Sequence, residues 1–231
     1  MNHTHLERTT LIELPDPQAA FEHENNFYLS SAPSRLHKPI AHYELYKRTV
    51  GISGAFAELG IFKGTSFVRF LGYRSMLESA NARKFVGFDV FGKFPDATLE
   101  SDKNMLHAYT ENAGEQSLSM EQLQQVMEMK NAASNVELVA GNINETVPRF
   151  VQENPHIRFS MIHLDVDLYE PSRTTMEFLF PLLSVGGILA LDDYGIWEGE
   201  TKAVDEYLAG TSYKIERFPF AAAPSFIVKD K

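Results

Sequence analysis

The stretch that decides the fold is LDVDLYEPSRTTMEFLFPLLSVGGILALDDYG, residues 164–195. It begins where one apolar run, FSMIHL at 159–164, ends, and it contains a second run, GGILAL at 186–191, after helix-like sequence. Apolar runs joined in this way predict two parallel strands that are buried on both faces of a sheet. The carboxyl ends of such strands meet at one edge of the sheet. The sequence therefore predicts four carboxylates at that edge: Asp165, Asp167, Asp192 and Asp193.

Close carboxylates need a compensating charge. Like charges raise one another's pKa and destabilise a fold, whereas a shared cation offsets their repulsion. The chain has no cysteine, so a metal site must use oxygen or imidazole ligands, and carboxylates suit Mg²⁺, Mn²⁺ or Ca²⁺. The structural alternative is that each aspartate caps a loop or starts a turn. His163, inside the first run, is expected to be a core histidine and not a ligand.

Further apolar runs lie on both sides of this stretch. Before it come AFAEL at 55–59, KFVGFDV at 84–90 and NVELVAG at 135–141, mostly followed by helix-like sequence. This alternation predicts an α/β fold with a parallel sheet and helices on both faces. After it, TSYKIERFPF at 211–220 and SFIVKD at 225–230 are separated by too few residues for a helical crossover. They are expected to pair antiparallel at the sheet edge.

The chain shows no internal repeat and no linker, so we expect one domain at 34–231, preceded by an arm at 1–33. Ser34 is expected to cap a helix that runs to about residue 48, and another helix is expected at 63–78. The segment at 93–133 follows a strand end and contains a capping box, Ser119 and Gln122. This insertion is expected to form a lid, with an ordinary pair of covering helices as the alternative.

A second group of polar and small residues follows the first predicted strand, in AELGIFKGTS at 57–66. Its Glu-x-Gly-x-x-x-Gly spacing differs from the dinucleotide and phosphate-loop signatures, but its glycines let the backbone approach a ligand. Asp89 ends the next strand, where a carboxylate can accept hydrogen bonds from both ribose hydroxyls. Phe88 or Phe91 is expected to form an apolar wall beside the base. Alternatively, Asp89 and Asn142 cap a turn or a helix. The predicted nucleoside site contains Glu58, Gly60, Gly64, Thr65, Ser66, Asp89, Gly141 and Asn142.

Composition narrows the choice of partner. A net charge of -10 with 21 basic residues argues against binding nucleic acid or an anionic membrane through bulk electrostatics. No apolar run approaches the ~20 residues that cross a bilayer, and the first residues do not resemble a signal peptide. We therefore expect a cytoplasmic protein with a small-molecule partner. The arm's Phe21, Phe27 and Tyr28 favour a homodimer, or alternatively fold back on their own domain.

These motifs resemble the macrocin and mycinamicin sugar O-methyltransferases, a metal-dependent group of class I methyltransferases. The resemblance covers roughly residues 35–230 and is sharpest in Asp-x-Asp-Leu-Tyr-Glu, Gly-Gly and Asp-Asp-Tyr of residues 164–195. It implies a Rossmann-like sheet of seven strands in the order 3-2-1-4-5-7-6, with S-adenosylmethionine as methyl donor. It also implies magnesium held by Asp165, Asp192 and Asp193, with Asp165 or Asp167 as proton acceptor. Catechol O-methyltransferase, a more distant relative, has a lysine base where this chain has Leu168.

The favoured function is metal-dependent O-methylation of a hydroxyl on a small acceptor, expected to be a nucleotide-linked or natural-product sugar. A phenol or catechol acceptor is the alternative within the same chemistry. A metal-dependent hydrolase or phosphotransferase would use the same acidic cluster, but it needs phosphate-binding elements that we do not find in the sequence. A non-catalytic nucleotide-binding protein would need only the nucleoside site.

Overall fold

One sheet of seven strands organises the molecule, in the order β3-β2-β1-β4-β5-β7-β6 that the resemblance implied. The computed structural model describes residues 12–231. Strands β1 to β5 run parallel, β7 is antiparallel to β5, and β6 is antiparallel to β7, which confirms the predicted edge pair. The strands are β1 (Ala55–Leu59), β2 (Phe85–Asp89), β3 (Val136–Ala140), β4 (Phe159–Leu164), β5 (Leu183–Leu191), β6 (Glu216–Arg217) and β7 (Ser225–Val228).

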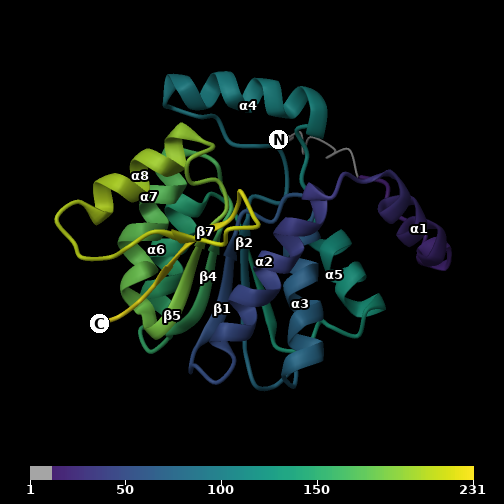
Figure 1. The fold of residues 1–231 in the computed structure, drawn as a ribbon, viewed down its shortest axis with the longest axis horizontal. Helices are drawn as coiled ribbons and strands as arrows, with labels where there is room; N and C mark the ends of the chain where they lie inside the picture. Colours follow the sequence, from purple (N-terminus) through teal and green to yellow (C-terminus); the bar gives the residue numbers. More distant parts are fainter. Residues whose placement is uncertain (1–11) are drawn as a thin grey trace, which may run out of the picture.

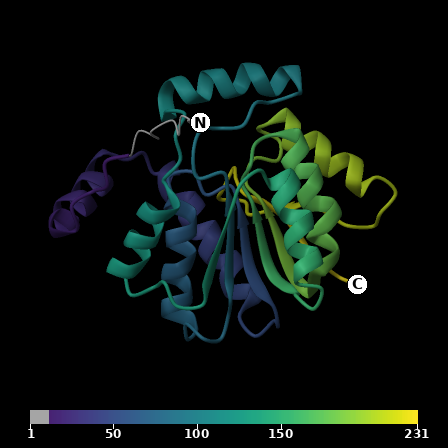
Figure 2. The same cartoon turned by 180° about the vertical axis from the view of Figure 1, so that it is seen from behind.

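Two layers of helices cover the faces of the sheet (Figure 1 and, from behind, Figure 2). Each layer has its own buried apolar cluster. One face is covered by α2 (Ser34–Thr49), α3 (Thr65–Leu77) and α5 (Met120–Met129). The opposite face is covered by α6 (Ile143–Glu153), α7 (Tyr169–Phe178) and α8 (Glu198–Leu208), with the short 3-10 turn η2 (Phe180–Leu182) after α7.

Alternation along the strands decides which side chains meet which layer. In β1, Phe56 packs toward α2 and α3 and stacks on Phe85 of β2, with ring centroids 4.4 Å apart, whereas Leu59 packs toward α6 and α7. Burying an aromatic side chain of this size stabilises the fold by about 1.5–3 kcal/mol. The same alternation places the polar side chains of Glu58 and His163 on the α2 and α3 face.

The predicted insertion separates into two helices with different positions. α4 (Glu100–Ala113) lies across the carboxyl ends of the strands, whereas α5 packs beside α3 (Figures 1 and 2). The predicted capping box is confirmed at the start of α5. The N–H of Gln122 donates to Ser119 Oγ and the N–H of Ser119 donates to Gln122 Oε1, each over 3.2 Å. Only α4 is therefore placed to cover the edge of the sheet.

The N-terminal part departs from the sequence prediction. α2 begins at Ser34, but its N-cap is Pro33 without a side-chain hydrogen bond, so the prediction of a Ser34 cap is wrong. Part of the expected arm is helical, as η1 (Pro17–Ala19) and α1 (Ala20–Ser30), while residues 1–11 lie outside the described residues. α1 buries no side chain and exposes Phe21 and Tyr28. The homodimer stays a prediction.

Among residues 12–231, no helix is both long and apolar enough to cross a bilayer.

A glycine brings two loops into contact at the carboxyl edge. Gly60, after β1, has a φ of +86°, a backbone angle that residues with a side chain rarely adopt. A Cβ at this position would lie 1.8 Å from the carbonyl oxygen of Asp165, after β4. The N–H of Asp165 donates to the carbonyl of Leu59 over 2.9 Å, so the two loops pack backbone to backbone.

Gly60→Ala is expected to destabilise the protein by at least ~2 kcal/mol more than Gly51→Ala, measured by urea unfolding. Both positions have positive φ, but a Cβ at Gly51 meets nothing within 4 Å, so this control carries backbone strain without a clash. Equal losses of stability in the two variants would contradict the close packing of the two loops.

Candidate active site

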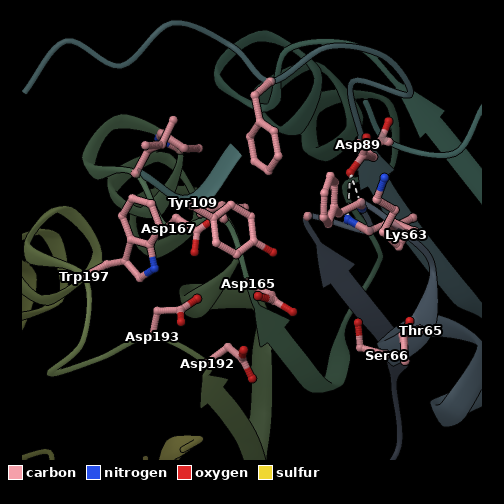
Figure 3. A pocket seen from close by; sticks show the side chains of 18 of the residues that line it. Lys63, Thr65, Ser66, Asp89, Tyr109, Asp165, Asp167, Asp192, Asp193 and Trp197 are labelled. Atoms are coloured by element: carbon pink, nitrogen blue, oxygen red, sulfur yellow. Dashed lines mark hydrogen bonds between the residues drawn. The ribbon is translucent and has the colours of Figure 1, made fainter. Parts of the chain in front are cut away.

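A cavity of about 910 Å³ lies at the carboxyl edge of the sheet. The loops after β1, β2, β4 and β5 line it, together with the start of α2 and with Tyr109 of α4. Figure 3 shows two sides, a glycine-loop side with Thr65, Ser66 and Asp89, and an acidic side with four aspartates. The volume lies in the range of small-molecule sites.

The carboxylate of Asp89 organises the glycine-loop side. Its Oδ2 accepts hydrogen bonds from the N–H groups of Ile61 and Phe62, over 2.7 and 2.9 Å, and its Oδ1 accepts one from Phe91 over 2.7 Å. Both oxygens therefore accept hydrogen bonds from backbone N–H groups, as in the turn-cap alternative. Asp89 also lines the cavity, where a ribose was predicted. The hydrogen bonds fix the loop that follows Gly60.

The structure divides the predicted nucleoside residues into two groups. Glu58 is fully buried and accepts a 2.7 Å hydrogen bond from the Ser66 hydroxyl, away from the cavity. Asn142 caps α6 by accepting the N–H of Asn144 over 3.0 Å. Glu58, Gly64 and Gly141 do not line the cavity, whereas the residues that do are Gly60, Thr65, Ser66, Asp89 and Asn142.

Phe88 and Phe91, one of which was predicted to form the wall beside the base, both pack into the apolar clusters. Phe88 belongs to the apolar cluster beneath α6, and Phe91 packs against the cluster on the opposite face, so neither lines the cavity.

Three carboxylates meet on the acidic side. Each of Asp165, Asp167 and Asp193 offers an oxygen, and these oxygens all lie within 4.8 Å of one another. Asp167 has a φ of +62° and its neighbour Leu168 donates to the carbonyl of Val166 over 2.6 Å, which makes Asp167 the centre of a tight γ-turn. Strained backbone of this kind persists only where the surrounding structure enforces it.

Burial and mutual repulsion favour the protonated form of these three groups. Burial first, and then the charge of Asp165, raise the pKa of Asp167 to about 7. Burial and neighbouring carboxylates also raise the pKa values of Asp165 and Asp193 well above the ordinary range. The oxygens that Asp167 and Asp193 offer lie within 4.8 Å of each other, so two ionised carboxylates would repel one another there.

Asp192 has different neighbours, although it follows the same strand as Asp193. One oxygen pairs with the ammonium of Lys38, and the other lies 3.3 Å from His163 Nε2 and 3.5 Å from His42 Nε2. Burial opposes ionisation, but the two histidines and Lys38 outweigh it and hold the pKa of Asp192 well below its usual range. Asp192 is therefore the ionised member of the four.

His163 links the two sides of the cavity from behind. Its Nδ1 lies 3.4 Å from the carboxylate of Glu58, and its Nε2 faces Asp192. Burial lowers the pKa of His163, but Asp192 and Glu58 raise it to about 10 overall. Although fully buried, as a core histidine is, the ring connects the glycine-loop and acidic sides.

Comparison with known proteins now identifies the family. The model of the macrocin-O-methyltransferase (TylF) family matches residues 40–216, which is more than half of the chain. The chain belongs to this family. Among curated relatives, a Streptomyces olivaceus enzyme named 8-demethyl-8-(2,3-dimethoxy-alpha-L-rhamnosyl)-tetracenomycin-C 4'-O-methyltransferase is 30% identical over 151 residues. That match covers 63% of this chain and 55% of the relative, so the chain spans about half the length of that relative.

Solved structures agree with the fold. CalS11, a calicheamicin methyltransferase, is 25% identical with a TM-score of 0.70, and the match covers 92% of this chain and 86% of that chain. The O-methyltransferase NovP is 20% identical with a TM-score of 0.70, covers 84% of this chain and 79% of that chain, and bears on the fold alone. A Rossmann-like methyltransferase fold is therefore confirmed for this member of the macrocin-O-methyltransferase family.

The residues on the acidic side fit a divalent cation, which the resemblance to this family implied. Asp165, Asp167 and Asp193 present converging oxygens, and burial and mutual repulsion raise their pKa values in a place where a cation would offset the negative charge. The ammonium of Lys38 already offsets one carboxylate. The predicted ligands Asp165, Asp192 and Asp193 stay a prediction, because Asp192 faces Lys38 and Asp167 takes its place in the cluster.

Several site residues of this family member were not found from the sequence. Lys38 comes from α2, whose periodicity indicated a helix but not which residue meets the aspartates. Tyr109 and Trp197 line the cavity from α4 and from the loop before α8. The sequence did contain a signal for His163. It is a histidine within an apolar strand, and strand residues two positions apart point to the same face of the sheet.

In EDTA, the melting temperature of this protein is expected to fall as the pH rises from 6 to 8. The pKa of Asp167, about 7 in the fold and 3.8 ordinarily, means that the folded state binds a proton that the unfolded state lacks, so stability is lost as the pH passes 7. Asp167→Asn should reduce this fall, whereas exposed Asp230→Asn should not. The raised pKa of His163 also makes stability fall as the pH rises, so part of the fall in melting temperature should remain in Asp167→Asn. An unchanged slope in Asp167→Asn would contradict the assignment.

Proposed function

We propose that this chain is an O-methyltransferase that moves the methyl group of S-adenosylmethionine to a hydroxyl of a sugar on a small molecule, with a divalent metal. One observation carries the proposal: a single cavity joins the loop after β1, held by Asp89, to the aspartates that follow β4 and β5. Doubly wound sheets bind their ligands at this edge. The cavity therefore offers adjoining binding sites for a methyl donor and for an ionisable acceptor.

The glycine-loop side supports binding of the donor. Gly60, Thr65, Ser66, Asp89 and Asn142 line it, and the hydrogen bonds of Asp89 to Ile61 and Phe62 hold the loop in place. α3 begins at Thr65, so its first N–H groups lack partners within the helix and are free for a polar ligand. Asp89 keeps lone pairs for ribose hydroxyls even with three backbone donors, because a carboxylate accepts about four hydrogen bonds.

The acidic side supports activation of the acceptor. In our proposal Asp165, Asp192 and Asp193 would hold the ion, and Lys38 would have to leave the Asp192 carboxylate. When bound, such a cation lowers the pKa of a hydroxyl beside it. Asp167, whose strained turn directs it into the cluster, then accepts the hydroxyl proton, since Leu168 offers no base.

The transfer balances without further reactants. The hydroxyl O–H proton passes to the Asp167 carboxylate, the oxygen forms a bond to the methyl carbon, and the carbon–sulfur bond breaks with its electron pair returning to sulfur. The products are a methyl ether and S-adenosylhomocysteine. The protein contributes chiefly alignment, because holding two reactants at near-attack distance removes much of the entropic barrier.

The relatives support a sugar acceptor. The Streptomyces olivaceus relative is named for a rhamnosyl group, and a further structure of CalS11, 25% identical with a TM-score of 0.66, is described as a TDP-rhamnose 3'-O-methyltransferase. In this chain Tyr109 and Trp197 form apolar walls beside the aspartates, a surface on which a sugar ring can pack. A biosynthetic role in the cytoplasm accords with a soluble small-molecule acceptor.

We expect release of S-adenosylhomocysteine when the protein, S-adenosylmethionine and Mg²⁺ are incubated with TDP-rhamnose or pooled nucleotide sugars, and loss of this release in EDTA. Asp193→Asn should lower turnover at least ~100-fold, because charge stabilisation by the metal is worth several kcal/mol. The exposed control Asp230→Asn should not. Undiminished turnover in EDTA would overturn the metal requirement, and turnover with catechol alone would overturn the sugar assignment.

The roles of two aspartates separate in a binding experiment with Mn²⁺. Asp192→Asn is expected to weaken Mn²⁺ at least ~10-fold, as loss of a ligand should, and Asp167→Asn is expected to change Mn²⁺ affinity little while lowering turnover at least ~100-fold. Calorimetry gives the Mn²⁺ affinity, and calorimetry with S-adenosylmethionine controls for folding. The reverse order of Mn²⁺ affinities would assign Asp167 as the ligand and Asp192 to Lys38.

A further inference from the structure

The helix that crosses the cavity contains one buried charge. Asp102 of α4 is fully buried, although every other residue of this helix is at least partly exposed. It lies on one helical face with Met105, Leu106 and Tyr109, at the spacing of positions that normally carry apolar side chains in a packed helix. A buried carboxylate at such a position requires hydrogen-bond partners.

Those partners come from two other helices. The N–H of Tyr169, the first residue of α7, donates to Asp102 Oδ2 over 2.9 Å, and the N–H of Gly199, in the first turn of α8, donates to Oδ1 over 3.0 Å. The first N–H groups of a helix lack partners within it, and helix N-termini favour a negative charge. One carboxylate therefore joins α4 to α7 and α8.

The fold leaves space for this carboxylate. A Cβ at Gly199 would lie 2.2 Å from Asp102 Oδ2 and 2.6 Å from the nitrogen of Tyr169. The φ of Gly199 is not positive, so glycine at this position is explained by the close approach and not by backbone conformation.

The joined helices lead directly to the acidic side. The segment before α7 carries Asp165 and Asp167, and the segment before α8 carries Asp192 and Asp193. On α4 itself, Tyr109 reaches over the cavity (Figure 3). The position of α4 therefore determines where Tyr109 lies relative to the aspartates.

The ring contacts of Tyr109 bridge both sides of the cavity. Its centroid lies 6.0 Å from that of Phe62 in the glycine loop and 6.1 Å from that of Trp197 before α8. A shift of α4 would therefore change the contacts of Tyr109 on both sides.

We propose that Asp102 is a positioning residue that fastens α4 across the cavity and keeps Tyr109 and the two aspartate segments in one arrangement. The reaction it serves rests on the proposed function, but the fastening itself does not. Because both oxygens of Asp102 accept from N–H groups, an asparagine cannot replace it: its amide nitrogen has no acceptor to offer.

Trp197 provides a readout that does not depend on activity. It is the only tryptophan in the chain, is 5% exposed, and packs with Ala97 and Leu168 against Leu106 of α4. Its emission therefore reports whether α4 is in place. Asp102→Asn is expected to shift this emission to the red and to raise acrylamide quenching at least ~2-fold, as Trp197 moves from a buried to a wet environment.

Two matched pairs of variants separate fastening from general stability. Glu111→Gln makes the same chemical change at an exposed position of α4 and should leave Trp197 unaffected. Gly199→Ala should reproduce the Asp102→Asn spectrum from the opposite partner, whereas Gly72→Ala, where a Cβ meets nothing within 4 Å, should not. Far-ultraviolet circular dichroism confirms that each variant is folded.

Catalysis gives the second readout. In the methyl-transfer assay, Asp102→Asn is expected to lower kcat/KM at least ~10-fold, because small displacements of positioning groups slow a reaction strongly. Unchanged Trp197 emission in folded Asp102→Asn and Gly199→Ala would overturn the fastening, and a changed emission with unchanged kcat/KM would overturn the positioning role. If the wild type transfers no methyl group but the emission shifts as expected, the proposed function fails and the fastening stands.

Discussion

Repulsion among four carboxylates at two neighbouring strand ends is the constraint on which this structure depends. Parallel strands bring Asp165 and Asp167 beside Asp192 and Asp193, and the surrounding fold removes much of the water that would otherwise screen them. The chain responds in two ways: it ionises Asp192 against Lys38, and it favours protons on the other three. Because these carboxylates repel one another, a divalent cation stabilises this site more than it stabilises an ordinary acidic surface.

The rest of the edge holds this cluster in place through backbone contacts. Gly60 lets the loop after β1 touch the loop after β4, and Asp89 holds the same loop by its N–H groups. Behind them, His163 connects Glu58 to Asp192. The sites proposed for the donor and for the acceptor are thus parts of one connected framework, and α4 completes it from above (Figure 1).

Most of the fold followed from the sequence because the strands are short, apolar and separated by helical periodicity. The bounds of β1 were predicted to the residue, and the edge pair followed from the short connection before β7. The aspartate positions followed from the same reasoning. What the sequence did not reveal depends on contacts between distant segments: that Lys38 meets Asp192, and that Asp102 is buried. Periodicity describes one segment at a time and does not indicate which helix face meets which loop.

The central claim is that these carboxylates share one divalent ion beside the methyl donor. Diffraction from crystals grown with S-adenosylmethionine and Mn²⁺, recorded at the manganese absorption edge, tests it most directly. We expect one anomalous peak within bonding distance of Asp165 and Asp193, with the sulfonium methyl group directed toward it. Donor density in the cavity without a peak among the aspartates would contradict the claim.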